Sequence, residues 1–540
     1  MRKILLTSLI LFTVFITGCS NPEEAANELF VNKAIKLIKQ AEQSQSTNLE
    51  ESLSYYKKAI LMMDKIIKKY PASSIAVKLA SGDEVINNKT LNDYRQIIVP
   101  EIEKRIKIKN NPLSLALDLA QSTNIEPERR DYFLKYIAYH YAKLNKFSEA
   151  FTTIEKIDDI ELKIQAMVSC SLWLNKLSSS NAAIDLLNEA TLLLPHLKNK
   201  DSFSKNKIRI AKKLYIFGDR VKAIEFVDNV SKDLKQANVK EQLELIKETV
   251  SSYVLFGETS KAQEIAELFI TKNDSVSSLS ESNEQENLAE IYALIGDIEK
   301  VITILNQATS SFLKYLNYRS VSFELAKAKQ YDSAIKLVKM TGDNGYISDT
   351  YLFIARHNER NGNKEDAIDA LKKMGPVILS LDSREDKARV NADISILYTE
   401  LKEPELGIKY AQAAYESFNS YTEPDLSDIA TIAIALLKAG KNNKANEIIG
   451  HGEKVYIEEI NSSYVSLRGV FDYLQALEVA GRFTDAISNF EQIPDGELNN
   501  NIKDSFFVIT LYGIAEQGTN VTKDNLDSLL LFISINYGQN

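Results

Sequence analysis

A pair of residues that recurs along most of this chain constrains its fold more than any other feature. A turn residue, usually glycine, stands five positions before a small residue, and the combination occurs ten times. The ten pairs are Asn145/Ala150, Ser178/Ala183, Gly218/Ala223, Gly257/Ala262, Gly296/Val301, Lys329/Ala334, Gly362/Ala367, Lys402/Gly407, Gly440/Ala445 and Gly481/Ala486. Successive small residues are 33, 40, 39, 39, 33, 33, 40, 38 and 41 positions apart. A period of this size predicts a stack of similar units rather than one globular core.

Two further positions keep the same register. Another small residue often stands twelve positions before the first, at Ala138, Ser171, Ala211, Ala289, Ser322, Ala355, Ser395 and Ala433. A large apolar residue often stands nine positions before it, at Tyr141, Leu174, Leu214, Tyr253, Tyr292, Leu325, Tyr398, Leu436 and Leu477. Small residues let two antiparallel helices approach closely, and glycine ends the first helix in a left-handed conformation without a Cβ penalty. Glycine and proline, which interrupt helices, number only 19 and 10 in 540 residues, so an all-α protein is expected.

These positions and their period resemble tetratricopeptide repeats, in which each unit of about 34 residues is a helix–turn–helix. The resemblance covers residues 111–500 and implies an all-α, right-handed α-solenoid of antiparallel helix pairs. A less regular copy lies within residues 27–69, where Ser52, Tyr56 and Ala59 match the small, aromatic and small positions of a second helix. The repeats of 38–41 residues predict longer second helices or ordered connectors, with a change of curvature between the two blocks that contain them.

The sequence divides into five parts on this basis. They are a signal segment (1–18), a modified cysteine with a short polar tether (19–26), an N-terminal helical region (27–110), the repeats (111–500) and C-terminal capping helices (501–540). Helices are predicted over 27–43, 47–69, 90–107, 502–516 and 523–536, with a loop at Ser81-Gly82-Asp83.

The first residues have the form of a secretory signal: a basic start at Arg2 and Lys3, an apolar stretch over 4–16, and small residues before a cysteine. The apolar stretch has 13 residues, whereas a membrane-spanning helix needs about 20. Ile16-Thr17-Gly18-Cys19 resembles the lipobox of bacterial lipoproteins. That resemblance implies cleavage before Cys19 and acylation of this residue, with palmitate-type chains that hold the protein on a membrane. An unmodified thiol beside an ordinary signal or anchor is the alternative.

The residue after the cysteine bears on the destination. Ser20, rather than Asp, resembles the sorting pattern of outer-membrane lipoproteins in enteric bacteria. An outer-membrane protein facing the periplasm is therefore expected, or a surface-facing one if the organism has a single membrane.

Composition argues against nucleic acid as a partner. After loss of Arg2 and Lys3, 63 basic side chains oppose 74 acidic ones, a formal charge of −11. Phosphate-backbone binding favours a basic stripe instead. The one cysteine besides Cys19 is Cys170, on an apolar helix, where a buried and unreactive thiol is expected.

Catalytic and metal-binding patterns do not occur. The four histidines, His140, His196, His357 and His451, are never within a helical turn of one another. The sequence has no HExxH pair, Cys–His cluster, GxSxG turn, P-loop or GxGxxG loop. We therefore expect no enzyme activity, metal or cofactor.

The family resemblance directs attention to binding, because the first helix of each tetratricopeptide unit lines the concave face. The residues that the repeat register places there are Tyr139, Lys143, Glu286, Glu290, Arg319, Phe323, Arg356, Glu359 and Arg360. An ordinary solvated polar face would have the same appearance. The Lys/Asn clamp that some family members use for C-terminal carboxylates does not recur, which argues against a chaperone-tail receptor.

The function expected from these features is a lipid-anchored scaffold that binds an envelope protein or peptide on its solenoid surface. The alternative is a glycan-binding uptake lipoprotein of the SusD type, which also joins a lipobox to tetratricopeptide-like helices. Such proteins present several tryptophans to sugar rings, whereas this chain has only Trp173, which is expected in a core.

Overall fold

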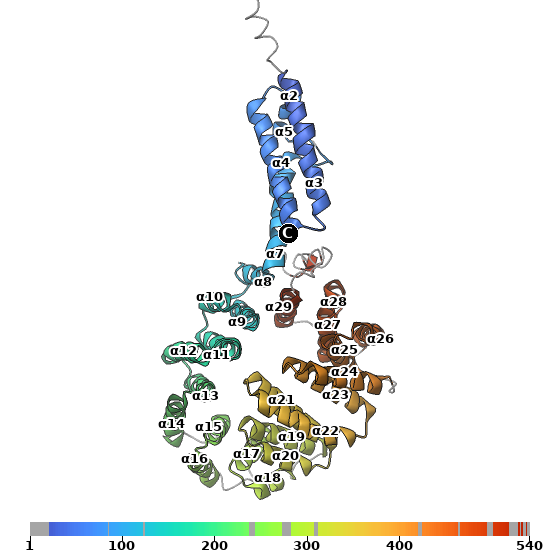
Figure 1. Ribbon diagram of the computed structural model, residues 1–540. Coiled ribbons are helices and arrows are strands. Elements are labelled where there is room, and N and C mark those ends of the chain that lie inside the picture. Colours follow the sequence, from blue (N-terminus) through green and yellow to red (C-terminus); the bar gives the residue numbers. More distant parts are fainter. Residues whose placement is uncertain are drawn as a thin grey trace, which may run out of the picture. The chain divides into compact units, whose positions relative to one another are not determined.

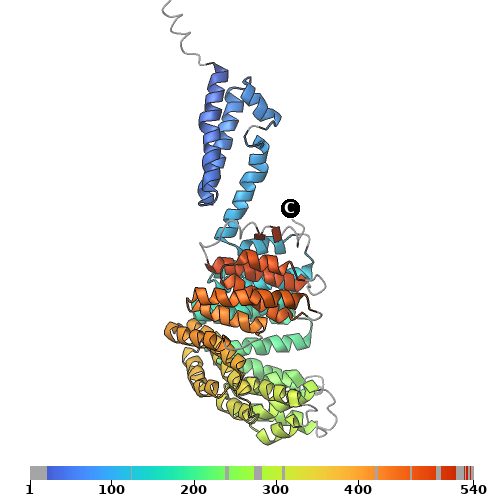
Figure 2. The same ribbon diagram turned by 90° about the vertical axis from the view of Figure 1, so that its right-hand side faces the viewer.

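The protein is described here by a computed structural model (Figures 1 and 2). It describes residues 21–540 except 85, 123–124, 237–242, 273–281, 307–310, 420–423, 463–464, 494–499, 518–527, 530, 533–535 and 537–540. The signal segment and Cys19 lie outside the described residues, as does most of the helix predicted over 523–536. Contacts divide the chain into two units, residues 1–115 with 517–540 and residues 116–516.

The first unit consists of helices that lie side by side (Figure 2). They are α2 (Pro22–Leu29), η1 (Phe30–Ile35), α3 (Lys36–Ser44), α4 (Leu49–Lys69), α5 (Ser74–Ser81), α6 (Leu91–Asp93), η2 (Tyr94–Ile98) and α7 (Val99–Asn110). Ser52 is buried, and its hydroxyl donates to the Ala41 carbonyl at 2.8 Å, so α3 and α4 approach closely. Gly82 ends α5 with φ +80°, in the predicted loop.

Helix α2 begins earlier than the predicted helix, inside the segment expected to be a polar tether. The Asn21 side chain accepts from the backbone N–H of Glu23, and Pro22 occupies the first helical turn. Glu23 and Glu24 add negative charge at the helix N-terminus, where the helix dipole favours it. These local signals start the helix at Pro22.

In the described residues of the second unit there are ten antiparallel helix pairs and a final single helix, preceded along the chain by α8 (Leu113–Ala120). The pairs are α9 (Pro127–Lys143) with α10 (Phe147–Glu155), α11 (Ile160–Leu177) with α12 (Ser180–Leu193) and η3 (Leu194–His196), α13 (Lys200–Phe217) with α14 (Arg220–Gln236), α15 (Leu243–Leu255) with α16 (Thr259–Lys272), α17 (Ser282–Leu294) with α18 (Ile298–Leu305), α19 (Ser311–Lys327) with α20 (Tyr331–Lys339), α21 (Asn344–Arg360) with α22 (Lys364–Leu379), α23 (Arg384–Glu400) with α24 (Pro404–Phe418), α25 (Leu426–Lys438) with α26 (Asn442–Ile460), and α27 (Leu467–Val479) with α28 (Phe483–Phe490); the final helix is α29 (Asn500–Gln517). The predicted all-α solenoid is confirmed.

The turn residues behave as the repeat pattern predicts. Nine of the ten have positive φ, including the non-glycine residues Asn145 (62°), Lys329 (60°) and Lys402 (61°). The exception is Ser178, at φ −132°. The small residues of every pair are buried, so the close approach of each pair of helices depends on them.

Helix lengths explain the uneven repeat spacing. The 33-residue repeats have second helices of 8 or 9 residues, namely α10, α18 and α20. The longer repeats have second helices of 14 to 19 residues. The predicted lengthening of the second helices is therefore confirmed, and α18 and α20 mark the short stretch between two longer blocks.

The array closes on itself through α29, which packs against the last repeat and also against the first (Figure 1). Arg129 of α9 donates from Nε and Nη2 to the two carboxylate oxygens of Asp504, at 2.7 and 2.6 Å. The rings of Phe133 and Phe507 meet edge to face at 6.4 Å. On its other side, α29 donates from the Thr510 hydroxyl to Glu478 of α27. The predicted capping helix thus joins the two ends of the repeat array.

One glycine tests how tightly the repeats pack. A Cβ at Gly452, in α26, would lie 2.4 Å from Cε2 of Tyr473, whose ring is fully buried. Gly452→Ala should therefore lower the free energy of unfolding by about 1 to 3 kcal/mol, as overpacked cores do. Urea unfolding measures this. Gly450→Ala, whose Cβ meets nothing within 4 Å, is the control and should be neutral or stabilising because alanine favours the helix.

Candidate partner-binding site

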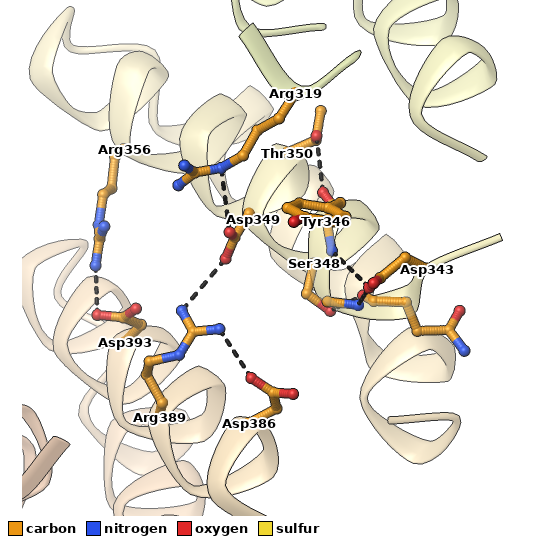
Figure 3. Close-up of polar contacts among 12 residues, drawn as sticks. Arg319, Asp343, Tyr346, Ser348, Asp349, Thr350, Arg356, Asp386, Arg389 and Asp393 are labelled. Carbon is orange, nitrogen blue, oxygen red and sulfur yellow. Dashed lines mark hydrogen bonds and ion pairs between the residues drawn. The ribbon is translucent and has the colours of Figure 1, made fainter. Parts of the chain in front are cut away.

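Alternating arginines and aspartates connect the first helices of three successive pairs (Figure 3). From α19, Arg319 Nε lies 3.2 Å from Oδ2 of Asp349 on α21. From α23, Arg389 Nη1 lies 3.3 Å from Oδ1 of the same aspartate, and its Nη2 lies 3.1 Å from Asp386. Burial opposes the charged form of Arg389, but the neighbouring carboxylates, Asp349 foremost, hold its pKa above the usual range.

Arg356 of α21 extends this arrangement by pairing with Asp393 of α23 (Figure 3). Burial raises the pKa of the Asp393 carboxyl, while Arg356 acts in the opposite direction. The side chains of Arg319 and Arg356 are still 39% and 44% exposed. Each of these two arginines contacts its aspartate through one nitrogen, and a guanidinium has five N–H donors, so this Arg–Asp ladder leaves donors of Arg319 and Arg356 for other partners.

Aromatic rings form a strip beside the ladder. Phe323 of α19 and Phe353 of α21 stack with centroids 4.2 Å apart and planes at 9°. His357 continues the stack, 6.1 Å from Phe353. Arg319 Cζ lies 4.9 Å from the Phe323 centroid at the other end. All three rings of this aromatic strip are partly exposed.

Positive charge gathers at the His357 end of the strip. Burial and the neighbouring cations Lys213, Lys327, Lys329 and Arg360 lower the pKa of His357 to about 4. Burial also lowers the pKa of Lys213 to about 8. His357 is therefore neutral at pH 7, and it lies in a positive environment.

The structure brings four of the predicted binding residues together on α19 and α21: Arg319, Phe323, Arg356 and Arg360. Two others are buried within the chain. Glu290 pairs with Lys247 at 2.9 Å, and Glu359 pairs with Lys176 of α11. Burial raises the pKa of the Glu290 carboxyl.

Glu286 lies one helical turn before Glu290 and is partly exposed. The remaining pair lies at another place, near the junction of α9 and α29. Tyr139 meets the edge of Trp173 at 6.1 Å, and the Lys143 ammonium lies 4.3 Å from the centroid of Tyr512. Trp173 is partly exposed, so its predicted place in a core is wrong.

Several residues of the site escaped the sequence analysis. Phe353 stands 30 positions after Phe323, three short of the local repeat of 33. It therefore lies about one helical turn earlier on the next helix, where the ring can stack on Phe323. This three-residue difference from the repeat spacing could have identified Phe353 as a stacking partner of Phe323. Lys213 approaches from α13, several repeats away, and no local pattern indicates it.

A second feature is a pocket of about 420 Å³ between the outer helices α20 and α22. Its lining includes the apolar residues Ile335, Ile354 and Ala370, and also Lys336 and Lys339 of α20.

Two side chains that could carry chemistry, Cys170 and His140, are buried. Cys170 is fully buried, as predicted, and burial raises the pKa of its thiol to about 12. Burial lowers the pKa of His140 to about 3. Among the described residues, no three His, Cys, Asp or Glu side chains are grouped to hold a metal ion. No helix in the described ranges is both long and apolar enough to cross a membrane.

Comparison with known proteins gives distant likeness in fold only. No family model and no curated protein matches the chain. Among solved structures, Ton1535 from Thermococcus onnurineus NA1 is 12% identical over 68% of this chain and 96% of its own, with a TM-score of 0.28. The APC/C hetero-tetramer Cut9–Hcn1 is 12% identical over 87% and 95% (TM-score 0.24). Yeast Tom70 is 14% identical over 73% and 97% (TM-score 0.25). Likeness at this level assigns no activity.

Proposed function

We propose that this protein is a membrane-anchored scaffold of the cell envelope that binds a protein or peptide segment on the inner face of its repeats, meaning the face formed by the first helix of each pair. The observation that carries the proposal is the partly exposed aromatic strip beside the half-exposed arginines of the ladder. Aromatic and arginine side chains are the residues that most often dominate protein interfaces. Charged side chains elsewhere on the inner face are already neutralised by ion pairs within the chain, such as Lys247–Glu290. The aromatic strip is therefore the favoured place for a partner.

Affinity capture from envelope extract tests this function. The mature repeat protein should enrich a specific protein partner, and Phe323→Ala with Phe353→Ala should abolish the enrichment. The matched control is Phe147→Ala with Phe151→Ala, which removes another stacked pair, on α10. Absence of any partner with the native protein, or retention by the strip variant, would contradict the proposal.

The anchor rests on the lipobox resemblance at Cys19 and has its own test. Cys19→Ser should move the protein from the membrane fraction to the soluble fraction, because acyl chains supply the membrane affinity. Its circular dichroism and thermal unfolding should match those of the lipidated protein. A variant that misfolds, or that stays with membranes after a high-salt wash, would show that anchor and scaffold are not separable in this way. Fractionation of inner and outer membranes locates the wild type.

One observation favours the glycan-binding alternative: Trp173 is partly exposed beside Tyr139. A glycan array distinguishes the two functions. Glycan binding that Trp173→Ala abolishes would favour the alternative, provided that the strip variant still binds.

A further inference from the structure

The cations around His357 differ from other charged groups of the inner face in how they are neutralised. Lys176 and Lys327 belong to the same region and pair with Glu359 and Glu324. Lys213, Lys329 and Arg360, here called the cation cluster, form no ion pair within the described part of the chain. The Lys213 ammonium donates instead to the Asn361 side-chain oxygen at 3.3 Å.

This grouping is unusual in an acidic chain. Acidic side chains outnumber basic ones by 74 to 65, yet here three cations lie near one another without a carboxylate paired to any of them, because the nearby Glu359 and Glu324 pair with Lys176 and Lys327. Lys329 and Arg360 are exposed, whereas Lys213 is partly buried. A cation removed from water without a counter-charge is unfavourable, and burial lowers the pKa of Lys213 to about 8. A carboxylate supplied from outside the chain would relieve this cost.

The fold holds the cluster next to the aromatic strip. Phe353, His357 and Arg360 follow one another at intervals of four and three on α21, so they share one helical face. Lys213 reaches the end of this helix from α13, and Lys329 stands in the left-handed turn after α19 with φ 60°. Apolar rings and cations thus adjoin on one surface.

We infer that the cation cluster binds the carboxylates of an acidic segment of the protein partner, whose aromatic side chain packs on the strip. This inference rests on the proposed function and names the chemistry of its partner. Guanidinium groups bind carboxylates through two parallel hydrogen bonds, which suits Arg360 to this role. A nucleic acid or an anionic lipid surface fits less well, because the rest of this acidic chain would repel a long array of phosphates.

A labelled peptide tests the inference. The probe is a fluorescein-labelled helical peptide with Glu and Phe on one face, measured by fluorescence anisotropy against the soluble Cys19→Ser protein. A matched peptide has Gln in place of every Glu. We expect the Glu peptide to bind, its affinity to fall as salt rises, and the Gln peptide to bind about tenfold more weakly or not at all.

Variants locate the binding. Lys213→Gln with Arg360→Gln should weaken the Glu peptide about tenfold or more. Its melting temperature should change little, because neither side chain has a carboxylate partner and Lys213 loses only its 3.3 Å hydrogen bond to Asn361. The matched control is Lys336→Gln with Lys339→Gln, two exposed lysines of the outer pocket, and it should bind like wild type.

The only tryptophan provides a second readout. Lys176 Nζ lies 5.0 Å from the Trp173 centroid and pairs with Glu359, next to Arg360. Binding at the cluster should therefore change Trp173 emission, and the cluster variant should lose this change.

Three results would overturn the inference: equal binding of the Gln peptide, full binding by the cluster variant, or displacement of the Glu peptide by anionic phospholipid vesicles. The experiments also distinguish failure of this inference from failure of the proposed function. If the native protein captures an envelope partner that the strip variant loses, but never binds the Glu peptide, only the acidic chemistry is wrong. If it captures no partner at all, the proposed function falls.

Discussion

Replacing Arg129 with alanine is expected to cost the repeat unit about 3 to 5 kcal/mol of unfolding free energy, as loss of one member of a buried ion pair does. Arg129 and Asp504 are 19% and 4% exposed and share two charge-assisted hydrogen bonds. Removal of the guanidinium leaves the Asp504 carboxylate buried beside Phe507 with much of its neutralising charge gone. The effect should appear in urea unfolding of the soluble Cys19→Ser protein followed by circular dichroism.

Two controls distinguish the stability that comes from closing the repeat array from the stability that an ordinary surface ion pair contributes. Lys373→Ala removes the Lys373–Asp369 pair, whose side chains are 58% and 59% exposed, and should cost less than about 0.5 kcal/mol. Arg129→Met with Asp504→Leu should recover much of the loss, because apolar residues of similar volume can replace a buried pair. A cost for Arg129→Ala no larger than that of Lys373→Ala would mean that the α9–α29 contact contributes little to stability.

The repeat architecture could be predicted because each unit carries its own local signals. Turn residues such as Gly218 adopt the left-handed conformation, and small residues such as Ala223 lie in the contact between two helices. The conformation of the turn residue and the burial of the small residue both depend on neighbours within about forty positions. The two residues also recur often enough to show where each repeat begins. The lengths of the second helices followed from the same spacing.

Closure of the array could not be predicted in this way. Arg129 and Asp504 are 375 positions apart, and neither occupies a repeated position. The contact depends on the accumulated rotation of ten helix pairs, which small differences in each unit determine. The middle of α29 is apolar around most of its circumference, with Phe506, Phe507 and Val508 buried, although Ile509 is 37% exposed. Such a helix is usually covered on more than one side, and in α29 this property was the available signal.

The candidate site was predicted in part for the same reason. Repeat register identifies which residues face inward, and so it selected Arg319, Phe323 and Arg356. It does not tell which inward residues meet another part of the array. Glu359 forms an ion pair with Lys176 of α11 and so is not available to a partner, whereas Phe353 stacks on Phe323 of α19.

Glu478 gives the second large effect, and it concerns the same closing helix. This carboxyl group is buried in α27 and accepts a hydrogen bond from the Thr510 hydroxyl of α29. Burial raises its pKa from 4.5 to about 8. At pH 7 the folded protein therefore keeps this group protonated, whereas the unfolded chain, with an ordinary pKa near 4.3, ionises it.

The sign of the pH dependence follows from the number of bound protons. Between pH of about 4.5 and 8 the folded state binds more protons here than the unfolded state, so stability falls as pH rises and levels off above about 8. At about 1.4 kcal/mol per pH unit, the whole range corresponds to about 5 kcal/mol. Glu478→Gln should remove this dependence, so the variant should exceed wild type by several kcal/mol at pH 8 and match it below pH of about 5.

Urea unfolding from pH 5 to pH 9 measures the difference between the two proteins. Glu458→Gln, at an exposed position of α26, is the control and should change stability by less than about 0.5 kcal/mol at every pH. A parallel pH profile for Glu478→Gln and wild type would mean that the carboxyl ionises freely in the folded state. In that case α29 would have to separate from α27 enough to admit water, and closure of the array would be looser than the paired Arg129 and Asp504 imply.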